Sequence, residues 1–233
     1  MNMKKIILSF LFLIGFITID GQSKNLKVQF TDSFMQDSCT FSTIGRNTYF
    51  ILEPGYQLEL QGKEEKETVG LIITVLNETK KVGNVETRIV EEKETVNGVL
   101  VEISKNYFAC CKQTSSIFYF EEYVEIYKEG KVVSYEGSWI AERNNKAGII
   151  MPGTFLLGAR YYQEIAPGIA IDRAEIISIS DSLKTPCRVF SNCLKTEETT
   201  PLEPKNKEYK VYAPGIGLIK DGDLLLVKHG FIK

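Results

Sequence analysis

Apolar and polar residues alternate along most of the chain after about residue 46. Val99, Val101 and Ile103 have one parity, whereas Glu102 and Ser104 have the other. Successive side chains of a strand point to opposite faces of a sheet, so this period of two is typical of half-buried antiparallel strands. Stretches rich in β-branched and aromatic residues recur at 48–52, 56–60, 70–76, 116–120, 174–180 and 207–212. The pattern predicts an all-β chain with little helix.

Two-residue turn signals separate these stretches at the spacing of hairpins. Gly, Asn and Asp tolerate the positive φ that tight hairpin turns need. The signals are Gly83-Asn84, Asn97-Gly98, Glu129-Gly130 and Asp221-Gly222. We therefore expect residues 46–233 to form one curved antiparallel sheet, a half-barrel or an open barrel-like meander. Residues 22–45 are expected to be an N-terminal extension of this single domain.

A second turn device is repeated along the chain. Proline sets φ at the second position of a type II turn, and glycine supplies the positive φ of the third. The pattern occurs at Glu53-Pro54-Gly55, Ala166-Pro167-Gly168 and Ala213-Pro214-Gly215, each followed by a predicted strand. We expect three type II turns.

The first 21 residues have the pattern of a cleavable signal peptide. Lys4 and Lys5 precede an uncharged apolar stretch, Ile6–Ile19, of 14 residues. A membrane-spanning helix needs about 20 residues, so export with cleavage after Gly21 is favoured over an uncleaved anchor. No later stretch is apolar for long enough to cross a membrane as a helix. The sequence therefore predicts an exported protein, periplasmic or secreted, with no transmembrane segment in the mature chain.

Export makes disulfides permissible, and the chain has five cysteines. They are Cys39, Cys110, Cys111, Cys187 and Cys193. Cys110 and Cys111 would point to opposite faces of a strand and are not expected to share a partner. We expect a Cys111–Cys193 bridge, with five free and mostly buried thiols as the alternative. The Cys and His spacing of a zinc site is missing, so no metal is predicted.

Charge and motifs argue against several classes of function. The chain has 28 basic and 30 acidic side chains, a balance without the basic footprint of a nucleic-acid-binding protein. His229 is the sole histidine, so a Ser-His-Asp or Cys-His mechanism would depend wholly on it. The sequence also lacks a GxSxG, HExxH, P-loop or GxGxxG motif. We therefore predict no cofactor and lean toward a non-enzymatic protein.

One polar cluster stands out near the second Pro-Gly turn. Residues of one parity on a strand before the turn would meet residues of the strand that follows it. Polar ligand binding by this cluster would use Arg160, Tyr162, Glu164, Asp172 and Arg173. General acid–base work on a glycosidic bond would instead use two of Glu164, Asp172 and Glu175. Cross-strand ion pairs that only stabilise the sheet are the third interpretation.

Aromatic residues are concentrated in another part of the sheet. They are Phe118, Tyr119, Phe120, Tyr123, Tyr127 and Trp139. Most of this surface is expected in the core. If the sheet curls without closing, part of it would line an apolar groove for a lipid, a peptide or a partner.

Three blocks of sequence resemble a family of exported bacterial β-rich proteins. The opening block is N-x-Y-F-x-L-x-P-G at Asn47–Gly55. The middle block is GARYYQEIAPG at 158–168 with DRAE at 172–175, and the tail is CLKTEETTPLEP at 193–204 with YAPGIGL at 212–218. The resemblance covers about residues 46–228 and implies a secreted or periplasmic β protein, without implying an activity. It also implies that Cys187, at a position of a small turn residue, is the odd thiol.

Together these observations favour an exported binding module with a concave face for an apolar small molecule, a lipid or an envelope partner. A carboxylate-dependent hydrolase is one alternative. A structural or assembly protein of the envelope, pairing through an edge strand or an odd cysteine, is another.

Overall fold

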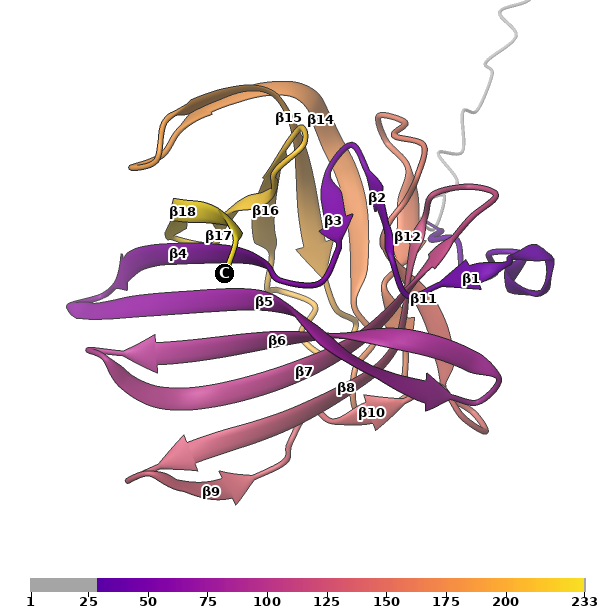
Figure 1. The fold of residues 1–233 in the computed structure, drawn as a ribbon, viewed down its shortest axis with the longest axis horizontal. Coiled ribbons are helices and arrows are strands. Elements are labelled where there is room, and N and C mark those ends of the chain that lie inside the picture. The colour runs from indigo at the N-terminus through magenta and orange to yellow at the C-terminus, as the bar shows by residue number, and fades with distance from the viewer. Residues whose placement is uncertain (1–28, 233) are drawn as a thin grey trace, which may run out of the picture.

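The computed structural model describes residues 29–232, and strands dominate them (Figure 1). The predicted signal peptide, residues 1–21, lies outside the described residues. In the described part, the helical structure is a single 3-10 turn, Gln36–Ser38. Within these residues, no helix is long and apolar enough to cross a membrane.

Eighteen strands follow one another in the described part of the chain. The first nine are β1 (Phe41–Ser42), β2 (Gly45–Asn47), β3 (Phe50–Leu52), β4 (Tyr56–Glu64), β5 (Glu67–Val82), β6 (Val85–Val96), β7 (Val99–Cys111), β8 (Ile117–Lys128) and β9 (Lys131–Ser134). The others are β10 (Trp139–Ile140), β11 (Lys146–Met151), β12 (Arg160–Tyr162), β13 (Glu164–Ile165), β14 (Arg173–Lys184), β15 (Val189–Thr199), β16 (Glu208–Ala213), β17 (Gly217–Asp221) and β18 (Leu224–Phe231).

One antiparallel sheet holds all of these strands except the β2–β3 hairpin. Its main path runs β12-β14-β15-β16-β17-β18-β4-β5-β6-β7-β8-β11-β13, so β18 near the end of the chain pairs with β4 near its beginning. The two ends of the path, β12 and β13, are separated in sequence by Gln163 alone. The sheet is therefore nearly closed and barrel-shaped, with β4–β8 on one side and β14–β16 on the other (Figure 1). This confirms the predicted fold class.

Three of the four predicted hairpin turns lie where the sequence placed them, and the fourth is displaced by one residue. Asn97-Gly98 and Glu129-Gly130 have positive φ at both centre positions, whereas Gly83 has it at the first position alone. In the last hairpin Asp221 pairs with Leu224, so the centre is Gly222-Asp223 and the predicted Asp221-Gly222 centre is wrong. Gly222 takes the positive φ of 52° at the first position. As a result Asp221 belongs to β17.

The three Pro-Gly turns have the predicted geometry. Their glycines, Gly55, Gly168 and Gly215, have φ of 82°, 79° and 71°. In each turn, the N–H of the fourth residue donates to the carbonyl of the first, over 2.9–3.1 Å. This hydrogen bond and the positive φ at the third position define a type II turn.

The segment expected to be an extension is joined to the sheet by a disulfide. β1 pairs with the end of β7, with Phe41 opposite Cys111, and this register brings Cys39 to Cys111 with a Cα–Cα distance of 5.2 Å. The predicted Cys111–Cys193 bridge is therefore wrong, because Cys193 lies fully buried on β15, paired with Asp181 of β14. Its thiol is free, as are those of Cys110 and Cys187.

Candidate binding cavity

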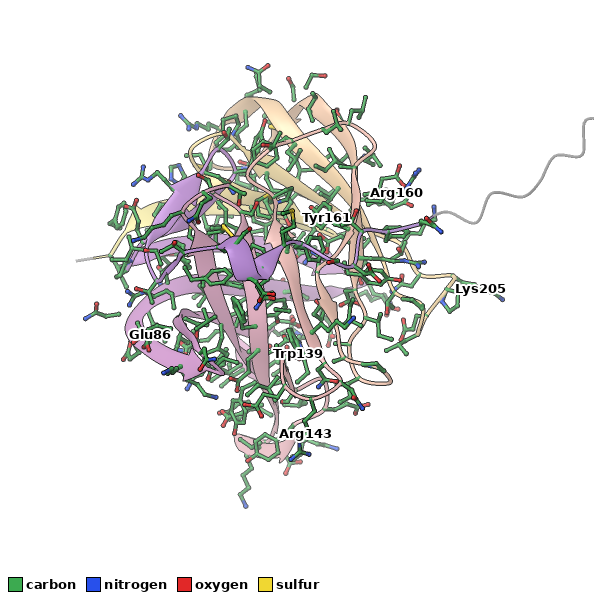
Figure 2. All side chains as sticks on the ribbon, turned by 90° about the vertical axis from the view of Figure 1, so that its right-hand side faces the viewer. Glu86, Trp139, Arg143, Arg160, Tyr161 and Lys205 are labelled. Carbon is green, nitrogen blue, oxygen red and sulfur yellow. A yellow bond between two sulfur atoms is a disulfide. The ribbon has the colours of Figure 1, made fainter. Side chains whose placement is uncertain are left out.

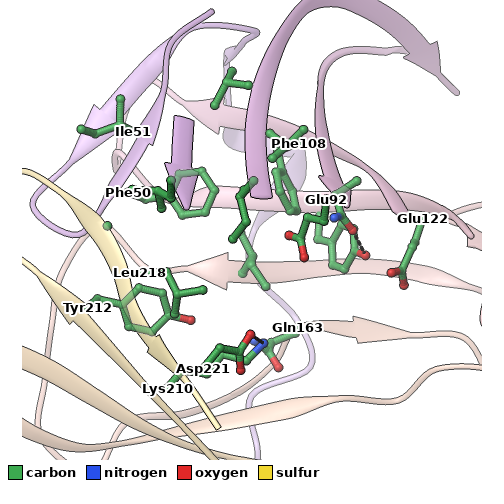
Figure 3. Close-up of a pocket in the computed structure, with 18 of the residues that line it drawn as sticks. Phe50, Ile51, Glu92, Phe108, Glu122, Gln163, Lys210, Tyr212, Leu218 and Asp221 are labelled. Atoms are coloured by element: carbon green, nitrogen blue, oxygen red, sulfur yellow. Dashed lines mark hydrogen bonds and ion pairs between the residues drawn. The ribbon is translucent and has the colours of Figure 1, made fainter. Parts of the chain in front are cut away.

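The concave side of the sheet encloses a cavity of about 210 Å³ (Figure 3). Its apolar lining consists of Phe50, Ile51, Tyr56, Leu58, Ile73, Val75, Val90, Phe108, Ile150, Ile216 and Leu218. Its polar lining consists of Glu92, Asn106, Tyr119, Glu122, Gln163, Glu164, Asp172, Glu198, Lys210, Tyr212 and Asp221. Residues from both halves of the chain thus meet in one space.

Polarity changes along the strands from one end of the cavity to the other. On β6 the inward positions run from Val90 to Glu92, and on β7 they run from Phe108 to Asn106. These positions are two apart, so they share the inner face of the sheet. Cross-strand pairing places Val90 opposite Asn106. The inner face therefore has an apolar end and a carboxylate-rich end.

A bulge in β8 brings two side chains of unlike parity to the same cavity. The register with β7 shifts between Tyr107 and Phe108, whose partners on β8 are Glu121 and Tyr119. The extra residue on β8 allows Tyr119 and Glu122, three positions apart, both to line the cavity. The Tyr119 hydroxyl donates to Asn106 Oδ1.

The β2–β3 hairpin covers the apolar end of the cavity. Phe50 and Ile51 of β3 line it, and the Phe50 ring packs edge-on against Phe108 with 5.6 Å between centroids. The hairpin is held to the rest of the fold by the N–H of Gly215, which donates to the carbonyl of Thr48 over 2.7 Å. This end of the cavity is therefore closed by side chains.

At the polar end, one lysine faces several carboxylates. Lys210 Nζ lies 3.4 Å from Glu198 Oε2 and 3.5 Å from Asp221 Oδ2. Burial alone would lower the pKa of Lys210, but the carboxylates of Asp221 and Glu198 raise it well above its usual value. Glu198 also accepts hydrogen bonds from Gln163 Nε2 and Thr196 Oγ1. Lys210 is thus charged and already paired.

Glu164 and Asp172 meet at the next part of the polar end. Glu164 is 2% exposed, and its Oε1 accepts the backbone N–H of Asp172 over 2.5 Å. Burial and the neighbouring Asp172 carboxylate raise the pKa of Glu164 well above its usual value. Two of the acidic residues singled out from the sequence therefore lie in the cavity.

Glu92 and Glu122 are carboxylates whose pKa values lie close to neutral pH. Burial raises the pKa of each to about 7, and the Glu122 carboxylate also raises the pKa of Glu92 and of Glu164. Within residues 29–232, the Glu92 carboxylate has no hydrogen bond or ion pair. It is an acceptor aimed at the cavity without a protein donor.

Tyr212 of β16 supplies a second unpaired polar group. Its side chain is 6% exposed and lines the cavity. In Figure 3 its hydroxyl points toward the middle of the lining side chains. No group of the described residues shares a hydrogen bond with this hydroxyl. The hydroxyl is therefore available to a molecule or water in the cavity, because polar groups in a protein interior are nearly always hydrogen-bonded.

Two surface hollows share residues with the polar end of the cavity. One, of about 340 Å³, includes Glu92 and Asp221 together with Glu94 and Glu102. The other, of about 370 Å³, includes Glu122, Asp172, Glu198 and Lys210. A molecule entering from this side would pass between acidic side chains.

The remaining residues predicted for a site lie elsewhere. Arg160 makes two hydrogen bonds of 2.8 Å to Glu175, its cross-strand partner on β14. Arg173 places its guanidinium 4.5 Å from the centre of the Phe30 ring, which also contacts Tyr162. Arg160 is at the outer surface in Figure 2, whereas Tyr161 of the same strand points inward.

The expectation that Arg160, Tyr162 and Glu164 share a face is therefore wrong for Glu164. The strand is interrupted at Gln163, and both Gln163 and Glu164 line the cavity. The interruption arises because β12 pairs with β14, whereas β13 pairs with β11 on the other edge. Glu175 is thereby separated from the other two candidate catalytic carboxylates.

Sequence reasoning missed the residues Glu92, Glu122, Lys210, Tyr212 and Asp221. In Glu91-Glu92-Lys93-Glu94, a run of charges gave no indication that one carboxylate points inward. The KEYKVY stretch at 207–212 did predict a strand. On a strand, Lys210 and Tyr212 share one face and Tyr209 and Val211 share the other, and this alternation was the signal that could have placed Lys210 and Tyr212 together.

In the described part of the chain, no three Cys, His, Asp or Glu side chains are grouped so as to hold a metal ion. Comparisons of the chain with protein-family models, with curated proteins and with solved structures find no match.

Proposed function

We propose that this protein is an exported binding module, without catalytic activity, that takes a small and partly apolar molecule into the cavity of its curved sheet. The observation that carries the proposal is the cavity itself, apolar at its covered end and polar at its accessible end. Small-molecule sites are typically concave and mainly apolar, with a few polar groups that fix the orientation of the ligand.

The size of the cavity limits the ligand. Drug-sized molecules occupy pockets of roughly 300–1,000 Å³. The cavity, at about 210 Å³, is smaller. A single short alkyl chain or one ring with a polar group is a suitable occupant, whereas a two-chain lipid would need the cavity to open.

Export of this module is supported by the signal-peptide pattern and by the family resemblance, and the disulfide agrees with them. Disulfides persist in oxidising compartments, and the Cys39–Cys111 bridge joins segments 72 residues apart. We place the protein in the periplasm or outside the cell.

The two alternatives have less support. A hydrolase could use the pair Glu164 and Asp172, but Glu175 is engaged by Arg160 outside the cavity. An assembly role through an odd cysteine would need Cys187, since Cys110 and Cys193 are buried. Neither alternative accounts for the apolar half of the cavity.

Substitution of Ile73 by tryptophan tests the proposal. Ile73 lines the cavity, and Ile72 beside it on β5 points outward with 39% exposure. Hexan-1-ol, a neutral amphiphile, is titrated into each protein and binding is measured by NMR. We expect Ile73→Trp to weaken binding at least about tenfold, a loss of about 1.4 kcal/mol, because the indole fills the space. Ile72→Trp is the matched control and should bind like the wild type.

Two results would contradict the proposal. One is equal binding of hexan-1-ol by Ile73→Trp and wild type, which would place the ligand elsewhere. The other is the absence of any hexan-1-ol binding by the wild type, together with no co-purifying molecule in native mass spectrometry of protein from its own host.

A further inference from the structure

The polar end of the cavity carries an excess of negative groups. Six carboxylates line it, and one cation, Lys210, faces them. Lys210 is within 3.5 Å of two of these carboxylates, Glu198 and Asp221. The other four belong to Glu92, Glu122, Glu164 and Asp172, and no lysine or arginine among the described residues lies within ion-pair distance of them.

This imbalance is costly without a compensating cation. Like charges at close range resist ionisation together, and burial removes the water that would otherwise solvate them. Both effects raise the pKa of Glu92 and of Glu122 to about 7, and the more distant Lys210 ammonium only partly opposes them. A cation placed among these carboxylates would favour their charged forms, so binding of a cation is coupled to loss of protons.

A second observation, independent of the carboxylates, points to a polar ligand group at this end. The Tyr212 side chain is 6% exposed and lines the cavity, and its hydroxyl has no hydrogen-bond partner in the described part of the chain. The hydroxyl oxygen can accept a hydrogen bond from an ammonium, while the O–H group donates a hydrogen bond to a carboxylate. Glu198 and Asp221 both act electrostatically on this hydroxyl.

The rest of the cavity indicates that the cation is organic. Phe50, Leu58, Ile73 and Val90 continue the same space away from the charges. A metal ion would make no use of this apolar surface. A hydrocarbon group attached to an ammonium would bury its apolar surface there, which favours binding.

From these observations we propose that the ligand of the cavity is a small apolar primary amine, with its ammonium at the carboxylate-rich end, beside Glu92 and Glu122. The inference rests on the proposed function and narrows its ligand class. The hydrocarbon part of the amine lies between the β2–β3 hairpin and β5–β6. Lys210 stays paired with Glu198 and Asp221 and disfavours a second ammonium beside it.

The test compares three probes that share one chain length and differ in the terminal group. Hexylamine, hexan-1-ol and hexanoate are titrated at pH 7.5 by calorimetry. We expect hexylamine to bind at least about tenfold more tightly than hexan-1-ol, and hexanoate to bind most weakly. In two buffers that differ in ionisation enthalpy, hexylamine binding should release protons at pH 6.5, and hexan-1-ol binding should not.

A charge-removing double variant locates the ammonium. Glu92→Gln/Glu122→Gln keeps the shape of both side chains, and we expect it to bind hexylamine no more tightly than hexan-1-ol. Its retained binding of hexan-1-ol shows that the cavity is intact. Glu175→Gln, which removes one carboxylate on the outer face, should leave all three affinities unchanged.

Each contrary result has a distinct meaning. If hexylamine and hexan-1-ol bind equally and Ile73→Trp abolishes both, the amine inference is wrong and the binding module stands. Tightest binding of hexanoate would make Lys210 the anchor and overturn the inference. Tight binding of Ca²⁺ without binding of hexylamine would overturn it in favour of a metal. If none of the three probes binds, the amine inference is overturned, and the proposed function fails with it when native mass spectrometry also finds no co-purifying molecule.

Discussion

Single side chains decide the electrostatics of this molecule, and Glu92 and Glu122 are the most informative of them. Both sit on the inner face of the sheet, where burial raises their pKa to about 7. A carboxyl of the unfolded chain has a pKa of about 4.3. Between these values the folded protein holds protons that the unfolded chain has released. The folded protein without ligand is therefore most stable when the carboxyls of Glu92 and Glu122 are both neutral.

This coupling predicts that stability falls as the pH rises. From about pH 4.5 to 7 the folded state binds more protons than the unfolded state, so the free energy of unfolding drops by roughly 1.4 kcal/mol per pH unit for each group. Above about pH 7 both states have released these protons, and this contribution levels off. Urea unfolding of the ligand-free protein at several values from pH 5 to 8 measures the slope.

The double variant Glu92→Gln/Glu122→Gln gives the matched comparison. We expect it to have a shallower slope than the wild type and to exceed the wild type in stability at pH 8. Glu175→Gln, on the outer face, should keep the wild-type slope. Identical slopes in all three proteins would show that these carboxyls are solvated and that their pKa is not raised.

At the scale of residues, the sequence predicted part of the site. Glu164 and Asp172 were chosen because they flank a tight turn, and that reasoning holds because the type II turn brings them together. Glu102 and Ser104 were expected to oppose an apolar face, yet Ser104 is 5% exposed and Val99 is 61% exposed. Alternation of apolar and polar residues identifies a strand. It does not identify the buried face of that strand when the interior of the sheet is itself polar.

At the scale of strands, two local features position these residues. They are the bulge of β8 and the disulfide that joins the segment before β1 to the end of β7. The bulge rotates Glu122 into the cavity beside Tyr119, and the disulfide fixes the end of β7. The Phe41 ring, two residues after Cys39, packs edge-on against Phe118 and Phe120 on the outer face of β8. The N-terminal segment thus covers aromatic side chains that a bare sheet would expose.

Removal of the disulfide should loosen this segment. A bridge between residues 72 apart is worth about 4 kcal/mol by the loop-entropy relation. We expect Cys39→Ala to lower the free energy of unfolding by about that amount, and Cys187→Ala to change it by less than about 1 kcal/mol. Urea denaturation measures both variants.

The pairing itself can be checked by alkylation. Iodoacetamide applied to the denatured, unreduced protein should modify three cysteines, and five after reduction. Modification of five without reductant would contradict the bridge. The pairing was beyond prediction from sequence, because it depends on the register of β1 against β7, and β1 is a strand of two residues.

At the scale of the whole molecule, a segment of six residues, Arg160–Ile165, brings the two ends of the sheet together. β12 and β13 are neighbours in sequence but lie at opposite ends of the sheet path, so the chain between Arg160 and Ile165 joins the two edges. The sequence predicted a curled sheet from its hairpins, because local turns specify which strands are neighbours. Closure was not predictable, since β11–β13 and β12–β14 pairing depends on long-range contacts that no turn signal encodes.

Gly148 is where this closure is tightest. A Cβ at this position on β11 would clash with the carbonyl oxygens of Tyr162 and Gln163, which are backbone atoms and cannot turn aside. Gly148→Ala should therefore lower the free energy of unfolding by about 1–3 kcal/mol or more. It should also weaken ligand binding, because Gln163 and Glu164 line the cavity.

Gly70→Ala is the matched control, since its Cβ would meet only the Thr95 hydroxyl, at 3.0 Å, and we expect a change below about 1 kcal/mol in the free energy of unfolding. Urea unfolding and hexan-1-ol titration of both variants measure the two effects. Wild-type stability and binding in Gly148→Ala would mean that β11 is not packed against the crossing segment, and that the sheet in solution is more open than described.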